Sequence, residues 1–194
     1  MKNVIKIAAL VLVSISLAFT GIDKKVVVLD VGHGGKDTGA MIDGVNEKDI
    51  NLAIAQKIKE LNTNSQVEII LTRATDEFIS LDERAKKIND AKPDYVISLH
   101  TNSSKDEHQS GTEIYYTLKN MHAEKSKQLA IDISAGFTEG EVSIKHADFY
   151  LLKKVNSPML LVELGYLSNP IEKAALVDKA SQLAFAQSIL KLMD

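Results

Sequence analysis

Long, largely apolar runs separated by segments with helical spacing are the feature that most constrains the fold of this chain. Residues 26–29, 95–99 and 159–162 are such runs, rich in Val, Leu and Ile. Strands buried on both faces have this composition, which is typical of parallel sheets covered by helices. The pattern therefore predicts an α/β fold in which a twisted, mostly parallel sheet carries helices on both faces.

Expected strands and helices alternate along the chain. Strands are expected at residues 24–30, 67–71, 95–99, 112–117, 149–152 and 159–163. Helices are expected at residues 47–61, 81–91, 123–137, 171–177 and 181–193, the first of them capped by Asn46. No repeat, low-complexity tract or Pro/Ser-rich linker divides the chain, so we expect a single catalytic domain over residues 21–194.

The N-terminus has the pattern of a secretory signal peptide. Lys2 and Lys6 precede a largely apolar stretch over residues 7–17, and the tripeptide SLA that ends at Ala18 has the small-x-small form of a cleavage site. We therefore expect residues 1–20 to be a signal peptide, and the protein to be exported to the periplasm, the cell envelope or the medium. The alternative is an uncleaved N-terminal anchor, although the apolar stretch is short for a membrane span.

Charge and composition exclude several classes of partner and site. Loss of Lys2 and Lys6 with the signal peptide moves the formal charge from -3 to -5. A mildly acidic domain offers no basic surface for nucleic acid or for anionic lipid, so we expect no nucleic-acid partner and no stable membrane insertion after cleavage. Cysteine is absent, so any metal site must use His, Asp or Glu.

Three expected strands end at residues that can bind a metal or act beside one. His33 follows the first strand in a glycine-rich loop, His100 follows residues 95–99, and Glu163 ends residues 159–163. Ligands of open α/β sheets bind beyond the carboxyl ends of the strands, so these side chains are expected to form one site. A carboxylate in such apolar surroundings needs a metal, an arginine or a raised pKa to offset its burial.

His33, His100 and Glu47, which is the first residue of the helix expected at 47–61, also have simpler structural interpretations. The loop around His33 could cradle phosphate, although its spacing fits neither the dinucleotide-binding nor the P-loop motif. His100 could be a partly buried side chain with satisfied hydrogen bonds, and Glu47 could simply favour the start of a helix through the helix dipole. Together, however, two histidines and a glutamate form the ligand set of several hydrolytic zinc sites, and a second glutamate can supply a general base.

Six stretches, in this order, carry a resemblance to a known family: LDVGHGGKDTGA, NEKD, ILTRATDEFISLDERAKKIND, ISLHTNSS, GTEIYY and LLVELGYLSN. They resemble the zinc-dependent N-acetylmuramoyl-L-alanine amidases of the amidase-3 type, which are bacterial peptidoglycan hydrolases. The resemblance covers roughly residues 25–193, nearly the whole expected domain. It implies a twisted, mostly parallel sheet flanked by helices.

The resemblance also implies a site and a reaction. His33, Glu47 and His100 fall on the Zn²⁺ ligand positions, and Glu163 falls on the catalytic glutamate, which acts as general base. The implied reaction hydrolyses the amide between N-acetylmuramic acid and L-alanine of the peptidoglycan stem peptide. Two alternatives remain open: a zinc peptidase that cuts within the stem peptide, and a non-catalytic peptidoglycan-binding module.

This sequence departs from the family pattern in small ways. Val31 stands where the family often has Pro, and Tyr166 stands where Phe is common. Some members carry an inserted helix that blocks the zinc, but the segment between Tyr116 and Ala123 is too short to hold one. We therefore expect an open site, with any control exerted by a protein activator or localiser.

A few further residues near these motifs have an expected role. Asn102 is expected to bind substrate, or else to close a turn. Asp30 is expected either to accept a hydrogen bond from a metal-bound histidine or to cap the end of a strand. A structural ion-pair network is the expected role of Arg73, Asp76 and Arg84.

Overall fold

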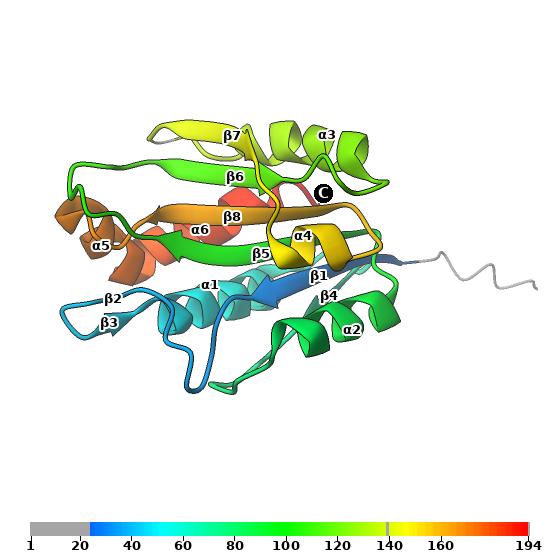
Figure 1. The fold of residues 1–194 in the computed structure, drawn as a ribbon, viewed down its shortest axis with the longest axis horizontal. Coiled ribbons are helices and arrows are strands. Elements are labelled where there is room, and N and C mark those ends of the chain that lie inside the picture. Colours follow the sequence, from blue (N-terminus) through cyan, green and yellow to red (C-terminus); the bar gives the residue numbers. More distant parts are fainter. Residues whose placement is uncertain (1–23, 139, 194) are drawn as a thin grey trace, which may run out of the picture.

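A six-stranded sheet forms the centre of the computed structural model, which describes residues 24–138 and 140–193 (Figure 1). The strands are β1 (Lys25–Val31), β4 (Val67–Leu71), β5 (Tyr95–Asn102), β6 (Thr112–Tyr116), β7 (Val142–His146) and β8 (Met159–Tyr166). Their order is β4-β1-β5-β8-β6-β7, and only the β6–β8 pair is antiparallel. The predicted mostly parallel sheet is confirmed. The expected signal peptide, residues 1–20, lies outside the described residues.

Helices cover both faces of this sheet, as predicted. They are α1 (Glu47–Leu61), α2 (Leu81–Ala91), α3 (Ala123–Ser134), α4 (Tyr150–Lys154), α5 (Pro170–Val177) and α6 (Lys179–Leu190). Helices α1, α3, α5 and α6 pack on one face, and α2 and α4 pack on the other. No helix within the described parts of the chain has both the length and the apolar character needed to cross a membrane.

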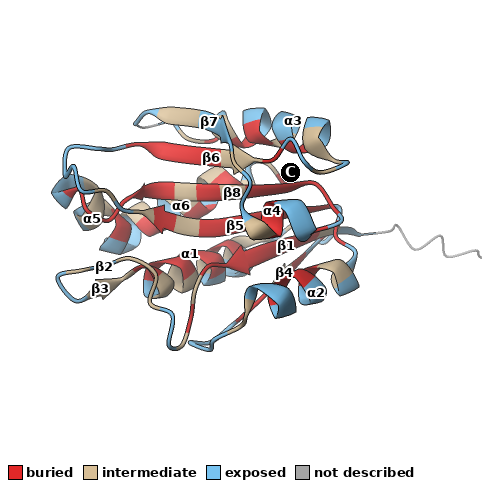
Figure 2. Ribbon diagram, in the orientation of Figure 1, coloured by how far each residue is buried: buried red, intermediate tan, exposed pale blue. Residues whose placement is uncertain are grey.

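Two hydrophobic cores lie on opposite faces of the sheet, because successive side chains of a strand point to opposite sides. Ile97 and Leu99 of β5 belong to the core under α1 and α6, whereas Val96 belongs to the core under α2 and α4. All three side chains are fully buried, and Figure 2 shows that the buried residues concentrate along the sheet. Burial on both sides explains why the strands have nearly continuous apolar sequences.

The structure corrects one local prediction and adds an edge strand and a hairpin that were not predicted. The strand expected at residues 149–152 is wrong, because this segment belongs to α4, where the adjacent Leu151 and Leu152 are both buried. Short apolar runs do not distinguish a strand from a buried helical turn. The edge strand β7 was not predicted, nor was the small hairpin of β2 (Met41–Ile42) and β3 (Val45–Asn46) in the glycine-rich loop.

Strands β5 and β8 continue beyond the ends expected from the sequence. His100 lies within β5, which runs to Asn102, and Glu163 lies within β8, which runs to Tyr166. The two residues are direct neighbours in the parallel register. These two residues are therefore carried by the last part of the paired strands, where the backbone is held by the sheet, rather than by the loops that follow.

Two buried arginines hold the loop that follows β1. Arg73 donates from Nε to the carbonyl of Val31 at 3.1 Å and from Nη2 to the carbonyl of Gly32 at 2.9 Å. Arg84 donates to the carbonyls of Val31 and His33. These bonds fix the backbone on which His33 is carried, so we call Arg73 and Arg84 the arginine clamp.

The expected ion-pair network exists in a different form. Arg84 pairs with Asp30 at 2.9 Å, with both side chains almost fully buried, and Asp76 pairs with Lys48 at 2.7 Å. Arg73 bonds backbone carbonyls instead.

Asp30 completes the hydrogen bonding of this buried ion pair. Its carboxylate accepts hydrogen bonds from Ser98 Oγ at 2.6 Å and Thr72 Oγ1 at 3.0 Å, and none from a histidine among the described residues. Burial alone would raise the pKa of Asp30, but Arg84 and Ser98 hold it below its ordinary value. Asp30 thus anchors the clamp and does not orient a histidine ring.

Removing the charge of Asp30 should destabilise the protein, because Arg84 would keep a buried charge without a partner. We expect Asp30→Asn to lower the free energy of unfolding by about 3 kcal/mol in urea titrations at pH 7. Because the pKa of Asp30 is lowered in the folded state, its stabilisation is present above the unfolded-state pKa of about 4 and is lost as the pH falls further. The difference between variant and wild type should therefore shrink in acid.

Asp90→Asn is the matched control, since it removes one carboxylate from the exposed pair with Lys86. Its effect should stay within about 0.5 kcal/mol. An Asp30→Asn variant as stable as this control would show that the buried pair does not hold the loop.

Candidate metal centre

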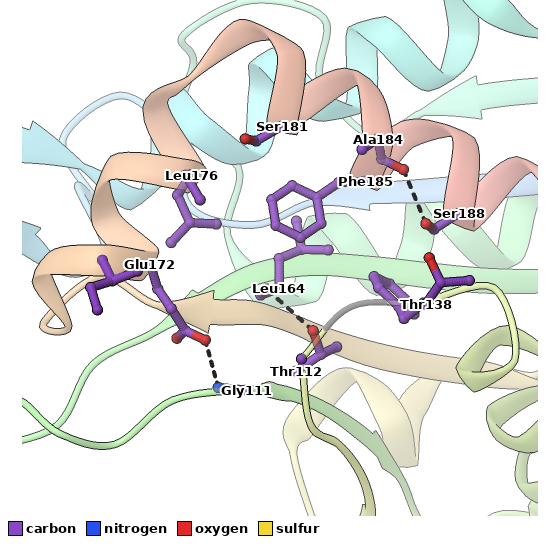
Figure 3. A pocket seen from close by; sticks show the side chains of 14 residues that line it. Gly111, Thr112, Thr138, Leu164, Glu172, Leu176, Ser181, Ala184, Phe185 and Ser188 are labelled. Atoms are coloured by element: carbon purple, nitrogen blue, oxygen red, sulfur yellow. Dashed lines mark hydrogen bonds between the residues drawn. The ribbon is translucent and has the colours of Figure 1, made fainter.

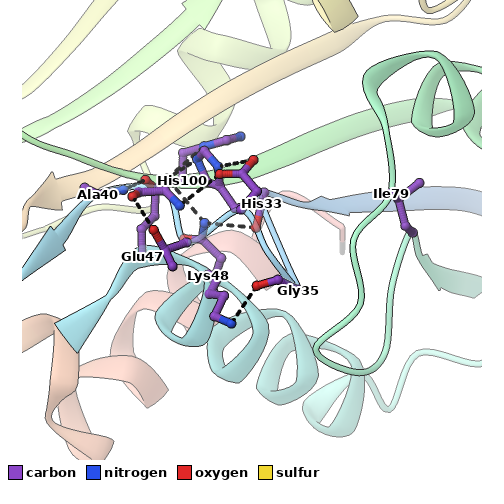
Figure 4. Close-up of polar contacts among 12 residues, drawn as sticks. His33, Gly35, Ala40, Glu47, Lys48, Ile79 and His100 are labelled. Atoms are coloured by element: carbon purple, nitrogen blue, oxygen red, sulfur yellow. Dashed lines mark hydrogen bonds and ion pairs between the residues drawn. The ribbon is translucent and has the colours of Figure 1, made fainter. Parts of the chain in front are cut away.

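His33, Glu47 and His100 converge at the carboxyl end of the parallel strands (Figure 4). They come from the loop after β1, from the first residue of α1 and from β5. One possible ligand atom from each side chain lies within 4.8 Å of the other two. The three residues expected to share a site are therefore brought together by parts of the chain that are distant in sequence.

One carboxylate oxygen stands between the two imidazole rings. Glu47 Oε1 lies 3.1 Å from His33 Nε2 and 2.8 Å from His100 Nδ1. The rings meet edge to face, with centroids 4.9 Å apart. Two nitrogen donors and one oxygen donor thus point toward a common volume, which is the donor set that Zn²⁺ takes in hydrolytic sites.

Backbone amides fix the carboxylate of Glu47. Oε1 accepts a hydrogen bond from the amide of Thr101 at 3.1 Å, and Oε2 accepts one from the amide of Ala40 at 2.9 Å. Although burial opposes ionisation, the hydrogen bonds with His100 and His33 hold the pKa of Glu47 well below its ordinary value. Asn46 occupies the N-cap position but makes no side-chain capping bond.

His33 is held in an uncommon backbone conformation, with a φ of 59°. Its Nδ1 lies 2.9 Å from Asp37 Oδ2, which leaves Nε2 directed at Glu47. Burial would lower the pKa of His33, but Glu47 and Asp37 raise it to about 9. The same two carboxylates would favour a metal cation in place of the ring proton, and a carboxylate on the second ring nitrogen is the usual support of a metal-binding histidine.

Asp37 was not singled out from the sequence. It stands in the same glycine-rich loop as His33, four residues further along. An aspartate four residues after His33 was the available signal, because a tight glycine-rich loop brings residues at this spacing into contact. The oxygen expected from Asp30 to orient a histidine is supplied by Asp37.

Two glycines leave room for the three candidate ligands. A Cβ atom on Gly32 would lie 2.5 Å from Cε1 of His100. A Cβ on Gly39, whose φ is +63°, would lie 2.4 Å from Oε2 of Glu47 and 2.7 Å from Cδ2 of His33. Neither position can accept a side chain without moving a candidate ligand.

Glu163 lies beside this cluster with an unsatisfied carboxylate. Its Oε2 is buried and has no hydrogen-bond partner among the described residues. Burial raises the pKa of Glu163 to about 7, although the charge of His100 opposes the rise. A buried acceptor without a partner is costly, and a ligand bound at the cluster would remove this cost. The orphaned oxygen and the donor set together fit a metal ion with a water beside it.

A second carboxylate that was not singled out from the sequence lies next to Glu163. Glu113 on β6 is its direct partner in the antiparallel register. Glu113 Oε2 accepts a hydrogen bond from Asn102 Nδ2 at 3.2 Å. Asn102 therefore reaches the site from the end of β5. The available sequence signal for Glu113 was a glutamate within the β-branched and aromatic stretch GTEIYY.

The approach to the cluster carries no inserted helix. Six residues join Tyr116 of β6 to Ala123 of α3, and they contain no helix or strand. The side chains of His33 and His100 keep 23% and 18% of their surface exposed. Solvent therefore reaches both imidazoles, as expected from the length of this segment.

A separate cavity of about 390 Å³ lies on the face of the sheet that α5 and α6 cover (Figure 3). It is bounded by β6, β8, α5 and α6, with Thr112, Leu164 and Phe185 in its wall. Glu113 follows Thr112, and Glu163 precedes Leu164. Because successive side chains of a strand alternate, both glutamates point to the opposite face of the sheet. The cavity is not part of the candidate centre.

Comparisons with known proteins place the chain in a family. The N-acetylmuramoyl-L-alanine amidase family model, Amidase_3, matches residues 27–194. Among relatives, YqiI of Bacillus subtilis is 32% identical, and the match covers 96% of this chain and 91% of that protein. The N-acetylmuramoyl-L-alanine amidase LytC of the same species is 33% identical over 80% of this chain, which spans one third (33%) of LytC.

Solved structures show the same fold. The catalytic domain of the amidase CwlV from Bacillus (Paenibacillus) polymyxa var. colistinus superposes with a TM-score of 0.80 at 35% identity, covering 87% of this chain and 96% of that one. The CwlD amidase of Clostridioides difficile, solved in complex with the GerS lipoprotein, has a TM-score of 0.78 at 31% identity and covers 88% and 96%. The match of the family model to nearly all of the described residues shows that the chain belongs to the N-acetylmuramoyl-L-alanine amidases of the amidase-3 type.

Proposed function

We propose that this protein is an exported, zinc-dependent N-acetylmuramoyl-L-alanine amidase. It hydrolyses the amide between N-acetylmuramic acid and L-alanine of the peptidoglycan stem peptide. The observation that carries the proposal is the convergence of His33, Glu47 and His100 beside the partnerless buried oxygen of Glu163. Membership of the amidase family identifies the bond on which such a centre acts.

His33, Glu47 and His100 would hold Zn²⁺ through two imidazole nitrogens and a carboxylate oxygen. When bound, zinc polarises the substrate carbonyl and lowers the pKa of a water to about 7. Asp37 keeps the His33 ring oriented, and the amides of Ala40 and Thr101 keep the Glu47 carboxylate in place. These fixed donors prepare the site before substrate arrives.

Glu163 is the general base and then the general acid. It accepts a proton from the attacking water, whose oxygen forms a bond to the lactyl carbonyl carbon. The carbon–nitrogen bond then breaks, and Glu163 returns the proton to the departing amine of L-alanine. The products are a lactyl carboxyl group on the glycan, which keeps the second hydrogen of the water until it ionises, and a peptide with a free amine. A pKa raised to about 7 suits a group that must both take and give a proton near neutral pH.

Asn102 would bind substrate at the edge of this centre. Its Nδ2 already donates to Glu113 and its Oδ1 accepts from the amide of Ser103 at 2.8 Å, so the amide plane is fixed. The remaining Nδ2 hydrogen is available to a substrate carbonyl. This orientation supports a role in holding the scissile amide rather than in proton transfer.

Residues 1–20 would direct the chain out of the cytoplasm, to the periplasm, the cell envelope or the medium, where peptidoglycan is its substrate. We expect neither a nucleic-acid partner nor stable membrane insertion after cleavage of this segment. A protein activator or localiser is a further expected partner. The complex of the related CwlD amidase with the GerS lipoprotein supports this expectation.

Replacing Glu163 should abolish turnover and leave the metal centre intact. We expect Glu163→Gln to lower the rate of peptide release from purified sacculi by at least about a hundredfold, because the amide cannot accept the proton of water. Metal analysis should still find one zinc per chain, and the urea midpoint should not fall.

Glu124→Gln, an exposed substitution on α3, is the matched control and should keep wild-type activity. An active Glu163→Gln variant would remove Glu163 from the mechanism. If the wild-type protein binds sacculi but releases nothing, the chain is a binding module.

Mass spectrometry of the digest separates the amidase from a peptidase. The amidase should release complete stem peptides that begin with a free L-alanine amine. Shortened stems that remain attached to the glycan would instead identify a zinc peptidase acting within the stem.

Removing the metal should abolish activity reversibly. After dialysis against a chelator, we expect sacculus digestion to stop and to return with one equivalent of Zn²⁺. Glu47→Gln should bind zinc more weakly by at least about tenfold in competition with a chromogenic chelator, because a charged ligand becomes a neutral one. Full activity in a sample shown to be metal-free would contradict the proposal.

A further inference from the structure

A second polar cluster extends the candidate centre across the sheet, away from the histidines. Glu113 on β6 is its centre and is 7% exposed. Four donors reach its carboxylate: Oε1 accepts from Tyr166 Oη at 2.8 Å and from Lys145 Nζ, and Oε2 accepts from Tyr115 Oη at 2.5 Å and from Asn102 Nδ2 at 3.2 Å. Both oxygens of Glu113 are thereby fully used by the protein itself.

The position of Glu113 requires a compensating cation. It stands directly opposite Glu163 in the β6–β8 register, and like charges facing each other across strands are unfavourable. Lys145 of β7 supplies the opposite charge through an ion pair with Glu113. Burial would raise the pKa of Glu113, but the hydrogen bonds from Lys145 and from the two tyrosines hold it below its ordinary value.

Lys145 is only partly used by this pair. Its side chain is 46% exposed, whereas that of Glu113 is 10% exposed. An ammonium group carries three donors, and the only side-chain acceptor it contacts within the described residues is Glu113. Lys145 therefore presents N–H donors and a positive charge to solvent from a fixed position.

Strand register places Lys145 on the same face of the sheet as Glu163. Glu113 pairs with Glu163 on β8 and with Ser143 on β7, and Lys145 is two residues beyond Ser143. Two strand spacings separate β8 from β7, which is about 10 Å. An extended peptide covers this distance with roughly three residues.

The two halves of the proposed substrate differ in charge. The lactyl carboxyl group of the sugar is consumed in the scissile amide, so the glycan side near the cut has no free carboxylate. The stem peptide carries free carboxylates beyond its first residue. A fixed ammonium a few residues from the reacting centre therefore matches the peptide half.

The geometry points to Lys145 as a carboxylate-binding subsite that directs the stem peptide across β6 and β7. This inference rests on the proposed function and names the part of the substrate that the site selects. Glu113 is a positioning residue that holds the ammonium in place, and Tyr115 and Tyr166 hold Glu113. The glycan half of the bound substrate then extends from the scissile amide toward His33 and His100.

Two soluble muropeptides test the inference: a disaccharide with a stem peptide whose carboxylates are free, and the same compound with those carboxylates converted to primary amides. We expect the wild-type protein to favour the free acid by about tenfold in kcat/KM, mainly through KM, as for one charge-assisted hydrogen bond. Lys145→Met should reduce this preference to about one, and Lys145→Arg should keep most of it. Lys86→Met, which removes a lysine from an exposed ion pair on α2, should leave the preference unchanged.

A double variant separates binding from simple charge compensation. Lys145→Met leaves the charge of Glu113 without its partner, and Lys145→Met/Glu113→Gln removes that charge as well. The preference should stay near one in the double variant, because the ammonium is still missing. Its return to the wild-type value would overturn the inference, since Lys145 would then act only by neutralising Glu113.

Failure of the subsite and failure of the proposed function give different results. Equal cleavage of both muropeptides by the wild-type protein would overturn the subsite and leave the amidase function standing. Absence of peptide release from either muropeptide and from sacculi would overturn the proposed function itself.

Discussion

The arginine clamp is the interaction on which the candidate centre depends. Arg73 and Arg84 donate to three successive carbonyls, those of Val31, Gly32 and His33. A left-handed backbone conformation at a non-glycine residue such as His33 costs about 1 kcal/mol. The hydrogen bonds from the two buried arginine side chains offset this cost. Arg73 lies two residues after β4, and Arg84 lies on α2 and pairs with Asp30 of β1. Because both arginines come from outside the loop that carries His33, the first histidine is placed before any metal binds.

Three glutamates at the site, one at the start of α1 and two on the neighbouring strands β6 and β8, have different surroundings. Glu47 faces two imidazoles and two backbone amides, and Glu113 faces an ammonium, two hydroxyls and an amide. Glu163, between them, has a buried oxygen with no partner among the described residues. The first glutamate is suited to a metal and the second to fixing neighbouring side chains. In the proposed mechanism, Glu163 is the carboxylate that accepts and returns the proton.

Much of the fold followed from periodicity, and much of the site did not. The parallel strands and the helix at residues 81–91 were predicted because their burial leaves a regular apolar pattern. The segment 149–152 was predicted wrongly because a short apolar run suits a helical turn equally well. Glu47 was identified only through the family resemblance, since a glutamate at a helix start is common. Asp37 contacts His33 through the turn of the glycine-rich loop, and Glu113 contacts side chains of three other strands. The pattern of residues along the chain does not specify either set of contacts.

Digestion of sacculi in water enriched in ¹⁸O tests the central claim most directly. Hydrolysis of the amide between N-acetylmuramic acid and L-alanine places the oxygen of water on the lactyl carboxylate. Mass spectrometry should therefore find the label on the glycan product and none on the released peptide, which should begin with a free L-alanine amine. A label on a peptide carboxylate, with the lactyl amide intact, would contradict the account.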